Sequence, residues 1–312
     1  MAVLKVLIVG AGVIGRVHAC LLAEAGHAVT VLARGWTAEQ LAREGITITD
    51  GVRTVTRPVR IIAEIDAQAY DLALIAVRRD QRDGVLGLLD RIDSPVLVPM
   101  FNSPLGLGVL RERFGASRIV GAFPGIGGYL AADGAVRYAR IRQQPTTIER
   151  RNGRESTVVQ AFSDAECAIS VVDDMDGWLA THAVFVVAIC AALERAGYSI
   201  ERLTDSREAL RTMVRAVRDG FAALENSGVT VAPAGLRFIF TAAPVPAAAW
   251  YWRRALRGPL GTVAIAPHAR ATRDTETAAL RVDLDSLLPP GSAGAFDRLV
   301  RTDRPGLPPG VR

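Results

Sequence analysis

Lysine is almost missing from this sequence of 312 residues: Lys5 is the only one, and all the other permanently cationic side chains are arginines. The net charge of +5 is spread along the chain. No run of about five basic residues occurs, and basic residues do not alternate with aromatic ones. These absences argue against a nucleic-acid partner.

Cysteine is scarce as well. Cys20, Cys167 and Cys190 form no Cys-x-x-Cys pair, which argues against a disulfide framework or a metal site and favours a reducing compartment. The apolar run 183–193 has the length of a core helix and falls short of the roughly 18 unbroken apolar residues of a membrane span. The amino terminus lacks the features of a secretory signal. We therefore expect a cytoplasmic protein with no membrane partner.

Half of the residues are hydrophobic, and the length allows two domains. In the first part of the chain, strand patterns at 3–9, 27–33, 70–77 and 94–101 alternate with helical ones, which predicts an α/β fold with a doubly wound, Rossmann-type parallel sheet. Alternation around Asp50-Gly51 predicts a hairpin with a primed turn. The short strands between 121 and 173 are expected at the far edge of the same sheet.

From residue 176 onward the pattern is nearly all helical, with helices expected at 178–196, 206–225 and 272–288. This predicts an all-α carboxy-terminal domain. The expected division is a sheet domain at 1–174, a helical domain at 175–290 and a tail at 291–312. The tail is rich in proline and glycine, and we expect it to be frayed.

The segment VLIVGAGVIG carries glycines in the spacing G-x-G-x-x-G between a buried strand and a helix. Gly10 permits the tight turn, Gly12 lets the backbone approach a pyrophosphate, and Gly15 lets the helix pack closely on the strand. Free N–H groups at the helix start, among them those of Val13 and Ile14, would bind the phosphates. The loop therefore predicts dinucleotide binding.

The second strand ends in LARG. Arg34 stands about twenty residues past the glycine loop, where NAD-specific proteins carry an acidic residue for the ribose hydroxyls. A guanidinium at this position can bind a 2′-phosphate. The sequence thus favours NADP(H) over NAD; the competing interpretation of Arg34 is a solvated loop arginine.

Four motifs together resemble the ketopantoate reductase (2-dehydropantoate 2-reductase) family: GAGVIG, LARG, IAVRRDQ and FNSPLG. The likeness reaches to about residue 285. It implies a Rossmann-type domain, a helical domain like that of 6-phosphogluconate dehydrogenase, and NADP(H) as cofactor. It also makes a homodimer a possible assembly. It also implies that Arg78, at the position of a family lysine, lies near the nicotinamide and that Asn102 binds the nicotinamide ribose or the substrate. Capping of strand ends is the alternative role for both residues.

The resemblance fails at one decisive position. Family members carry Trp-x-Lys early in the first long helix, and that lysine donates to the ketone oxygen; this chain reads Trp178, Leu179, Ala180. Because Lys5 lies in the first strand, no other lysine can take the role. The proton donor must differ, and ketopantoate itself is not expected as the substrate.

Three other residues are candidates for the reaction. His182 lies one helical turn after Trp178 and can act as a general acid; its alternative role is that of a satisfied core histidine. His268 and Glu276 lie where the resemblance implies substrate-binding and acidic catalytic residues, with Asp274 competing with Glu276. Three arginines could bind a substrate carboxylate, although a solvated charge is the favoured interpretation of each: Arg142, Arg270 and Arg273.

The leading hypothesis is an NADPH-dependent oxidoreductase that reduces a small ketone or 2-oxo acid at the cleft between the two domains. Two alternatives stay open. One is a catalytically silent NADPH-binding sensor or partner protein, since the lysine is missing while the glycine loop is intact. The other is a dehydrogenase of the opine or imine type, which acts on a C=N bond.

Overall fold

The computed structural model describes residues 2–301. Its amino-terminal domain is built on a five-stranded, all-parallel sheet with the order β5-β2-β1-β6-β7. The strands are β1 (Lys5–Val9), β2 (Ala28–Leu32), β5 (Arg60–Ile62), β6 (Leu72–Ile75) and β7 (Leu97–Pro99). This order is that of a doubly wound sheet, in which the chain changes direction between β1 and β6 and leaves a crevice at their carboxyl ends. The predicted Rossmann-type sheet is confirmed.

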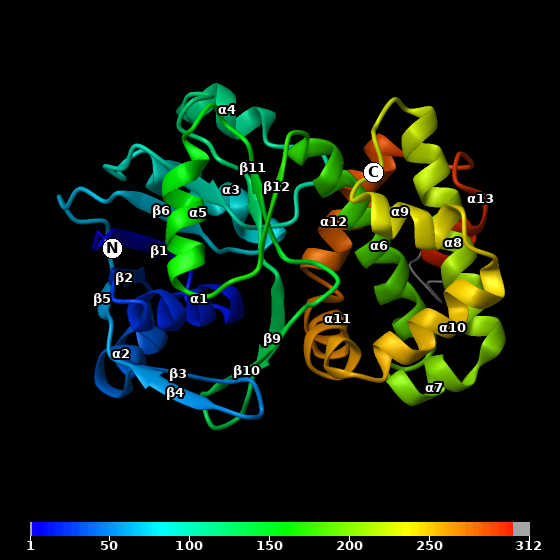
Figure 1. Ribbon diagram of the computed structural model, residues 1–312, viewed down its shortest axis with the longest axis horizontal. Helices are drawn as coiled ribbons and strands as arrows, with labels where there is room; N and C mark the ends of the chain where they lie inside the picture. Colours follow the sequence, from blue (N-terminus) through cyan, green and yellow to red (C-terminus); the bar gives the residue numbers. More distant parts are fainter. Residues whose placement is uncertain (1, 302–312) are drawn as a thin grey trace, which may run out of the picture.

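Helices cover this sheet on both faces, which explains why the central strands are continuous apolar runs. On one face, Val6 and Ile8 pack with residues of α1 (Val13–Glu24) and α5 (Glu155–Asp164). On the other face, Leu7 and Val9 pack with residues of α3 (Arg82–Leu89) and α4 (Gly108–Phe114). Helix α2 (Gly35–Glu44) follows β2 at the edge of the domain (Figure 1).

The strands between 121 and 173 do not extend the parallel sheet, contrary to our expectation. They form two further sheets within the described residues. One has the order β4-β3-β10-β9 and consists of β3 (Ile46–Thr49), β4 (Thr54–Arg57), β9 (Ile126–Leu130) and β10 (Val136–Arg140). The other has the order β12-β11-β8 and consists of β8 (Ala122–Phe123), β11 (Thr146–Glu149) and β12 (Ile169–Val172). The physical reason is that β3 offers an open edge to β10, a pairing between distant segments that local patterns do not reveal.

The predicted hairpin is present and is formed by β3 and β4. Its register continues to Asp50 and Arg53, where the Asp50 N–H donates to the Arg53 carbonyl at 3.3 Å, and Gly51 is the one connecting residue with a positive φ, +88°. A positive φ at the first central position is the feature of a type II′ primed turn. The Asp50 carboxylate accepts hydrogen bonds from the N–H groups of Val52 and Arg53 at 2.9 and 2.8 Å. This side-chain cap satisfies two N–H groups of the turn.

The carboxy-terminal domain is all helical, as predicted (Figure 1). Its helices are α6 (Met175–Arg195), α7 (Ile200–Asp205), α8 (Arg207–Asn226), α9 (Ala234–Thr241), α10 (Val245–Leu256), α11 (Ala266–Thr272), α12 (Glu276–Leu287) and α13 (Gly294–Val300). A π-helical segment, η2 (Leu260–Ile265), leads into α11. The helix expected at 272–288 is interrupted at 273–275, so that α12 begins at Glu276. Helices α11 and α12 lie at the junction with the sheet domain (Figure 1).

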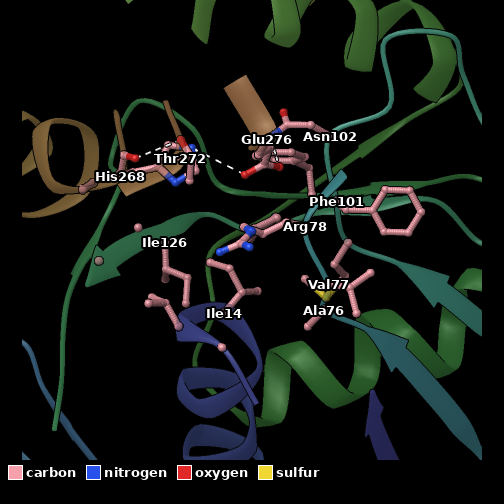
Figure 2. Close-up of a pocket in the computed structure, with 18 of the residues that line it drawn as sticks. Ile14, Ala76, Val77, Arg78, Phe101, Asn102, Ile126, His268, Thr272 and Glu276 are labelled. Atoms are coloured by element: carbon pink, nitrogen blue, oxygen red, sulfur yellow. Dashed lines mark hydrogen bonds and ion pairs between the residues drawn. The ribbon is translucent and has the colours of Figure 1, made fainter. Parts of the chain in front are cut away.

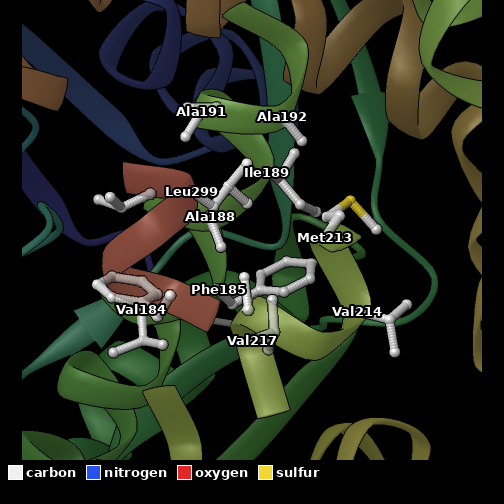
Figure 3. Packing of buried hydrophobic residues seen from close by; sticks show 14 of the residues in the cluster. Val184, Phe185, Ala188, Ile189, Ala191, Ala192, Met213, Val214, Val217 and Leu299 are labelled. Atoms are coloured by element: carbon white, nitrogen blue, oxygen red, sulfur yellow. The ribbon is translucent and has the colours of Figure 1, made fainter. Parts of the chain in front are cut away.

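Helix α6 is the centre of this domain. It begins at Met175, where the Asp174 carboxylate accepts a hydrogen bond from the Gly177 N–H at 2.8 Å. Its side chains pack against α8 and α13, with Val184 and Ala188 of α6 close to Val217 and Leu299 (Figure 3). Each aliphatic side chain buried in this way contributes about 1.5–3 kcal/mol to stability. By length and composition α6 could cross a membrane, but 89% of its apolar window is buried inside the protein, as expected of a core helix.

The tail that we expected to be frayed from residue 291 is partly ordered. Residues 294–300 form α13, and its Phe296 and Leu299 are buried in the helical core. The prediction was wrong for this segment because the proline and glycine pattern hid a short amphipathic helix. Residues 302–312 lie outside the described part of the chain.

Candidate active site

The three glycines of the loop after β1 meet different constraints. A Cβ on Gly10, whose φ is +109°, would lie 2.6 Å from the Ala76 carbonyl oxygen of the neighbouring strand end. A Cβ on Gly15 would lie 1.9 Å from the Gly10 carbonyl oxygen. A Cβ on Gly12 would meet no atom within 4 Å. Protein packing therefore requires Gly10 and Gly15, whereas the space at Gly12 is open to a ligand.

Gly12 also opens helix α1 without a side-chain cap. The first intrahelical bond is from the Arg16 N–H to the Gly12 carbonyl at 2.9 Å. No side chain caps the preceding N–H groups at Val13 and Ile14, which lie at the positive end of the helix. This cradle fits a pyrophosphate.

A cleft of about 990 Å³ starts at this loop and continues between the two domains (Figure 2). It contains every predicted site residue except one. The lining residues among them are Gly10, Gly12, Val13, Ile14, Arg34, Arg78, Asn102, His182, His268 and Glu276. Gly15 does not line the cleft, because it faces the strand beneath α1.

The two arginines predicted for the cofactor occupy different settings. Arg34, at the amino end of α2, is exposed and makes no side-chain hydrogen bond or ion pair with the residues described. Its guanidinium is free to bind an anion at the outer end of the cleft. Arg78 follows β6, and its Nε lies 3.2 Å from Oδ1 of Asp80. Arg78 thus lines the cleft, and the Asp80 carboxylate already neutralises part of its charge.

At the inner end of the cleft, Asn102, Glu276 and His268 form a cluster (Figure 2). Asn102 Nδ2 donates to Glu276 Oε1 at 3.0 Å, and His268 Nε2 lies 3.7 Å from Glu276 Oε2. The backbone N–H of Arg79 also donates to Glu276 Oε1, at 3.3 Å. Asn102 Oδ1 is buried and has no partner within residues 2–301. A buried acceptor without a partner is costly, so this oxygen marks the place where a hydroxyl or another donor of a ligand fits.

His182 lines the same cleft but in a different environment. Its ring stacks on Trp178, with centroids 5.2 Å apart and planes 5° apart, and lies 4.2 Å from the ring of Phe123. Burial, together with a smaller repulsion from His268, lowers the pKa of His182 to about 3. The imidazole is therefore neutral near pH 7 and carries no acidic proton to give. This setting favours the wall of the cleft over the predicted role as general acid.

Comparison with known proteins finds a family model that resembles the sheet domain. The model of the family "Ketopantoate reductase PanE/ApbA" matches residues 6–153. The predicted resemblance to the ketopantoate reductase family is confirmed. The matched segment covers the glycine loop, Arg34, Arg78 and Asn102. A comparison with curated proteins found no match.

Solved structures show the same fold over nearly the whole chain. A 2-dehydropantoate 2-reductase from Geobacter metallireducens is 19% identical, with a TM-score of 0.75, covering 95% of this chain and 98% of the other. The enzyme of the same name from Methylococcus capsulatus is 16% identical, with a TM-score of 0.70 and coverages of 95% and 94%. A D-mandelate dehydrogenase in a ternary complex with NADH and anilino(oxo)acetate is 15% identical, with a TM-score of 0.68 and coverages of 95% and 97%.

The position of the missing family lysine is filled by a core residue. Ala180 is buried and does not line the cleft, whereas Trp178 and His182 on either side of it do. Asp274, the competitor of Glu276, is exposed and lies 3.8 Å from Arg273. Of the two carboxylates, Glu276 is therefore the one placed at the site.

None of the three candidate carboxylate clamps lines the cleft. Arg273 Nε lies 2.9 Å from Glu194 Oε1, and the Arg270 guanidinium lies over the Tyr198 ring at 5.8 Å. Arg142 is exposed. The alternative that we gave, solvated or locally paired charges, describes them better.

Two features near the site were not predicted from the sequence. The first is an ion pair of Arg79 with Asp283, which joins the segment after β6 to α12. The second is the stripe of α6 that faces the cleft, including Phe185, Val186 and Ile189. Their spacing is helical, and a helical apolar stripe is the same whether it faces a core or a ligand cavity.

Proposed function

We propose that the protein is an NADPH-dependent oxidoreductase that reduces the carbonyl group of a ketone or a 2-oxo acid in the cleft between its domains. The observation that carries this proposal is the cluster of Asn102, Glu276 and His268 at the inner end of a cleft whose outer end is a dinucleotide loop. When bound, the nicotinamide supplies a hydride. The missing family lysine argues against ketopantoate as the substrate.

Arg34 supports NADPH rather than NADH. It stands at the end of β2 where the adenosine ribose is bound in this fold, and its guanidinium has no partner among the described residues. A neighbour of the same fold is described in complex with NADH, so the fold alone does not select the cofactor. The choice rests on the charge at this one position.

His268 is the proposed proton donor. Its side chain is 35% exposed, so solvent can return a proton to it after each turnover, and its Nε2 faces the cluster at Glu276. Glu276 faces the imidazole and orients it, while Asn102 holds Glu276 through Nδ2 and offers Oδ1 to a hydroxyl. Arg78 stays charged at any working pH and can stabilise negative charge on the carbonyl oxygen but cannot protonate it.

Turnover of NADPH against a panel of ketones, 2-oxo acids and 2-oxo esters tests the proposal. His268→Gln and Glu276→Gln should each lower kcat about 100-fold or more, with unchanged NADPH affinity by calorimetry. Arg270→Gln, on the same helix as His268 but outside the cleft, is the matched control and should keep full activity. Wild-type rates in both cluster variants would contradict the proposed donor.

The same assay separates the two other hypotheses. Turnover that requires an added amine would identify an opine- or imine-type dehydrogenase. Tight binding of NADPH without turnover of any carbonyl or imine would identify a sensor.

A further inference from the structure

The part of the cleft formed by the helical domain is apolar and aromatic. Helix α6 turns one stripe toward it, from Trp178 through Phe185 and Val186 to Ile189. Trp252 of α10 lines it as well, and so do residues of η2 and of the segment before α9. A ligand in this region meets hydrocarbon and ring faces, which favour an apolar group.

The two titratable side chains embedded in this wall are uncharged at neutral pH. Burial lowers the pKa of His182 to about 3 and raises the pKa of the Cys190 thiol to about 12. His182 lies between aromatic rings and presents a ring edge rather than a charge. The wall therefore offers no counter-ion.

The arginines of the cleft come from the sheet domain. Within residues 2–301 they are Arg16, Arg34 and Arg78. Arg16 donates from Nε to the Ala11 carbonyl at 2.7 Å, which holds it beside the glycine loop. Arg34 stands at the adenosine end, and Arg78 is bound to Asp80 through two nitrogens at 3.2 and 3.4 Å.

The helical domain contributes a negative side chain instead. Among its described residues, no arginine lines the cleft. Glu276 does, with only 4% of its surface exposed, and the proposed proton donor His268 already faces this carboxylate at 3.7 Å. A substrate carboxylate seated against the apolar wall would lose its hydration, find no arginine there and lie near the Glu276 carboxylate. An uncharged group of the same size meets none of these costs.

We propose that the substrate is an uncharged carbonyl compound with an aromatic or branched apolar substituent, such as an aryl ketone or a 2-oxo ester, rather than a 2-oxo acid. This inference rests on the proposed function and narrows it. The apolar substituent lies against the stripe of α6, and the carbonyl group faces Asn102 and His268. In the reaction the carbonyl carbon gains a hydride, the C=O π bond breaks, the oxygen takes a proton from His268, and NADPH is left as NADP⁺ beside a secondary alcohol.

Methyl benzoylformate and benzoylformate form the matched pair that tests this. Both carry the same phenyl ring and keto group, and they differ in the charge of the neighbouring group. We expect kcat/KM for the ester to exceed that for the acid about tenfold or more, because Arg78 is already bound to Asp80, His268 faces Glu276, and the apolar wall has no partner for the charge. Methyl pyruvate lacks the phenyl ring, and its kcat/KM should be lower than that of methyl benzoylformate by a similar factor.

Binding gives a readout that does not depend on catalysis. Methyl mandelate and mandelate are alcohols and cannot be reduced, so calorimetry on the NADPH-loaded protein measures recognition alone. Methyl mandelate should bind about tenfold or more tightly than mandelate. An acid that binds and reacts as well as its ester overturns the inference and leaves the reductase intact. Equal binding of the two alcohols together with no turnover of any carbonyl overturns both proposals.

A placed charge should reverse the preference. Val186→Arg introduces a cation at a half-buried position of the wall, and Leu260→Arg does so on η2. Each should lower the ester-to-acid ratio of kcat/KM about tenfold relative to wild type. Val282→Arg, at a site 66% exposed on α12, is the control and should leave the ratio unchanged. Thermal unfolding checks that both wall variants are folded. If the ester-to-acid ratio of kcat/KM is then unchanged in both, the substituent does not bind against this wall.

Discussion

Arg79 and Asp283 form a two-pronged ion pair between the sheet domain and α12, with Nε 2.6 Å from Oδ2 and Nη2 2.9 Å from Oδ1. Both side chains are nearly buried, with 12% and 9% of their surfaces exposed. Asp283 lies two helical turns after Glu276 on the same face of α12, and the backbone of Arg79 donates to Glu276. The ion pair therefore fixes the helix that carries the proposed catalytic carboxylate.

Breaking this pair should damage both stability and turnover. Arg79→Met or Asp283→Asn leaves a buried charge or dipole without its partner, and the free energy of unfolding should fall by about 3 kcal/mol. Because Glu276 loses its fixed position, kcat should fall more than the affinity for NADPH changes. Urea denaturation, steady-state kinetics and calorimetry measure the three quantities.

Two further variants complete this test. Arg79→Met combined with Asp283→Leu should regain most of the lost stability, because no buried charge is left unpaired. Arg43→Met removes an exposed ion pair, with side chains 69% and 50% exposed, and should change stability little. A stable, fully active Asp283→Asn protein would show that the pair does not position Glu276.

Alanine at two glycines of the loop should affect different properties: stability at Gly15 and NADPH affinity at Gly12. Gly15→Ala forces a Cβ into the Gly10 carbonyl oxygen and should lower the melting temperature by several degrees at least. Gly12→Ala, whose backbone φ of −79° suits alanine and whose Cβ meets only open space, should melt like wild type. It should nevertheless bind NADPH about tenfold or more weakly, because the methyl group stands where the pyrophosphate would lie. Unchanged NADPH affinity in Gly12→Ala would refute the cradle.

Reversing the charge at Arg34 should change the cofactor preference. In Arg34→Glu the affinity for NADPH should drop about tenfold to 100-fold, as expected when a charge-assisted hydrogen bond to phosphate is replaced by repulsion. The affinity for NADH should stay the same or rise, since a carboxylate can bind the ribose hydroxyls. Arg43→Glu controls for the change in net charge, because Arg43 lies in the last turn of α2, the helix that follows Arg34, and does not line the cleft. Equal losses for NADPH and NADH would exclude a role in phosphate recognition.

The buried imidazole of His182 should make the protein sensitive to acid. In the unfolded chain a histidine binds a proton below its usual pKa of 6.5, whereas in the folded protein the pKa of His182 is about 3. Between these values the unfolded state holds more protons, so stability is fully present above the unfolded pKa and is lost as the pH falls. The loss between about pH 7 and pH 4 is on the order of 3 kcal/mol.

His182→Phe removes this titration and keeps an aromatic ring in the stack. The free energy of unfolding of the variant should therefore fall less steeply below pH 6.5 than that of the wild type. A residual dependence should remain, because burial also lowers the pKa of His18 to about 4. Superimposable acid-unfolding curves for the two proteins would show that His182 is not held neutral. Full reductase activity in the same variant would agree with a proton donor other than His182.

Much of the sheet domain could be predicted because its signals are local. The continuous apolar strands, the glycine spacing and the place of Arg34 after β2 all follow from neighbouring residues, and each appears where the sequence indicated. Helix α13 was missed because its stability comes from the packing of Phe296 and Leu299 in the helical core. The pairing of β3 with β10 also joins segments that are distant along the chain.

The sequence by itself determined a Rossmann-type sheet with a dinucleotide loop, a helical second domain, and the loss of the family lysine. Tertiary structure alone decided which residues meet at the proposed site. Asn102 and Glu276 are 174 residues apart, and Arg79 and Asp283 are 204 apart, so no local pattern reveals that they meet. Burial, which depends on the whole packed molecule, likewise decided that His182 is a neutral part of the wall while the more exposed His268 stands beside Glu276.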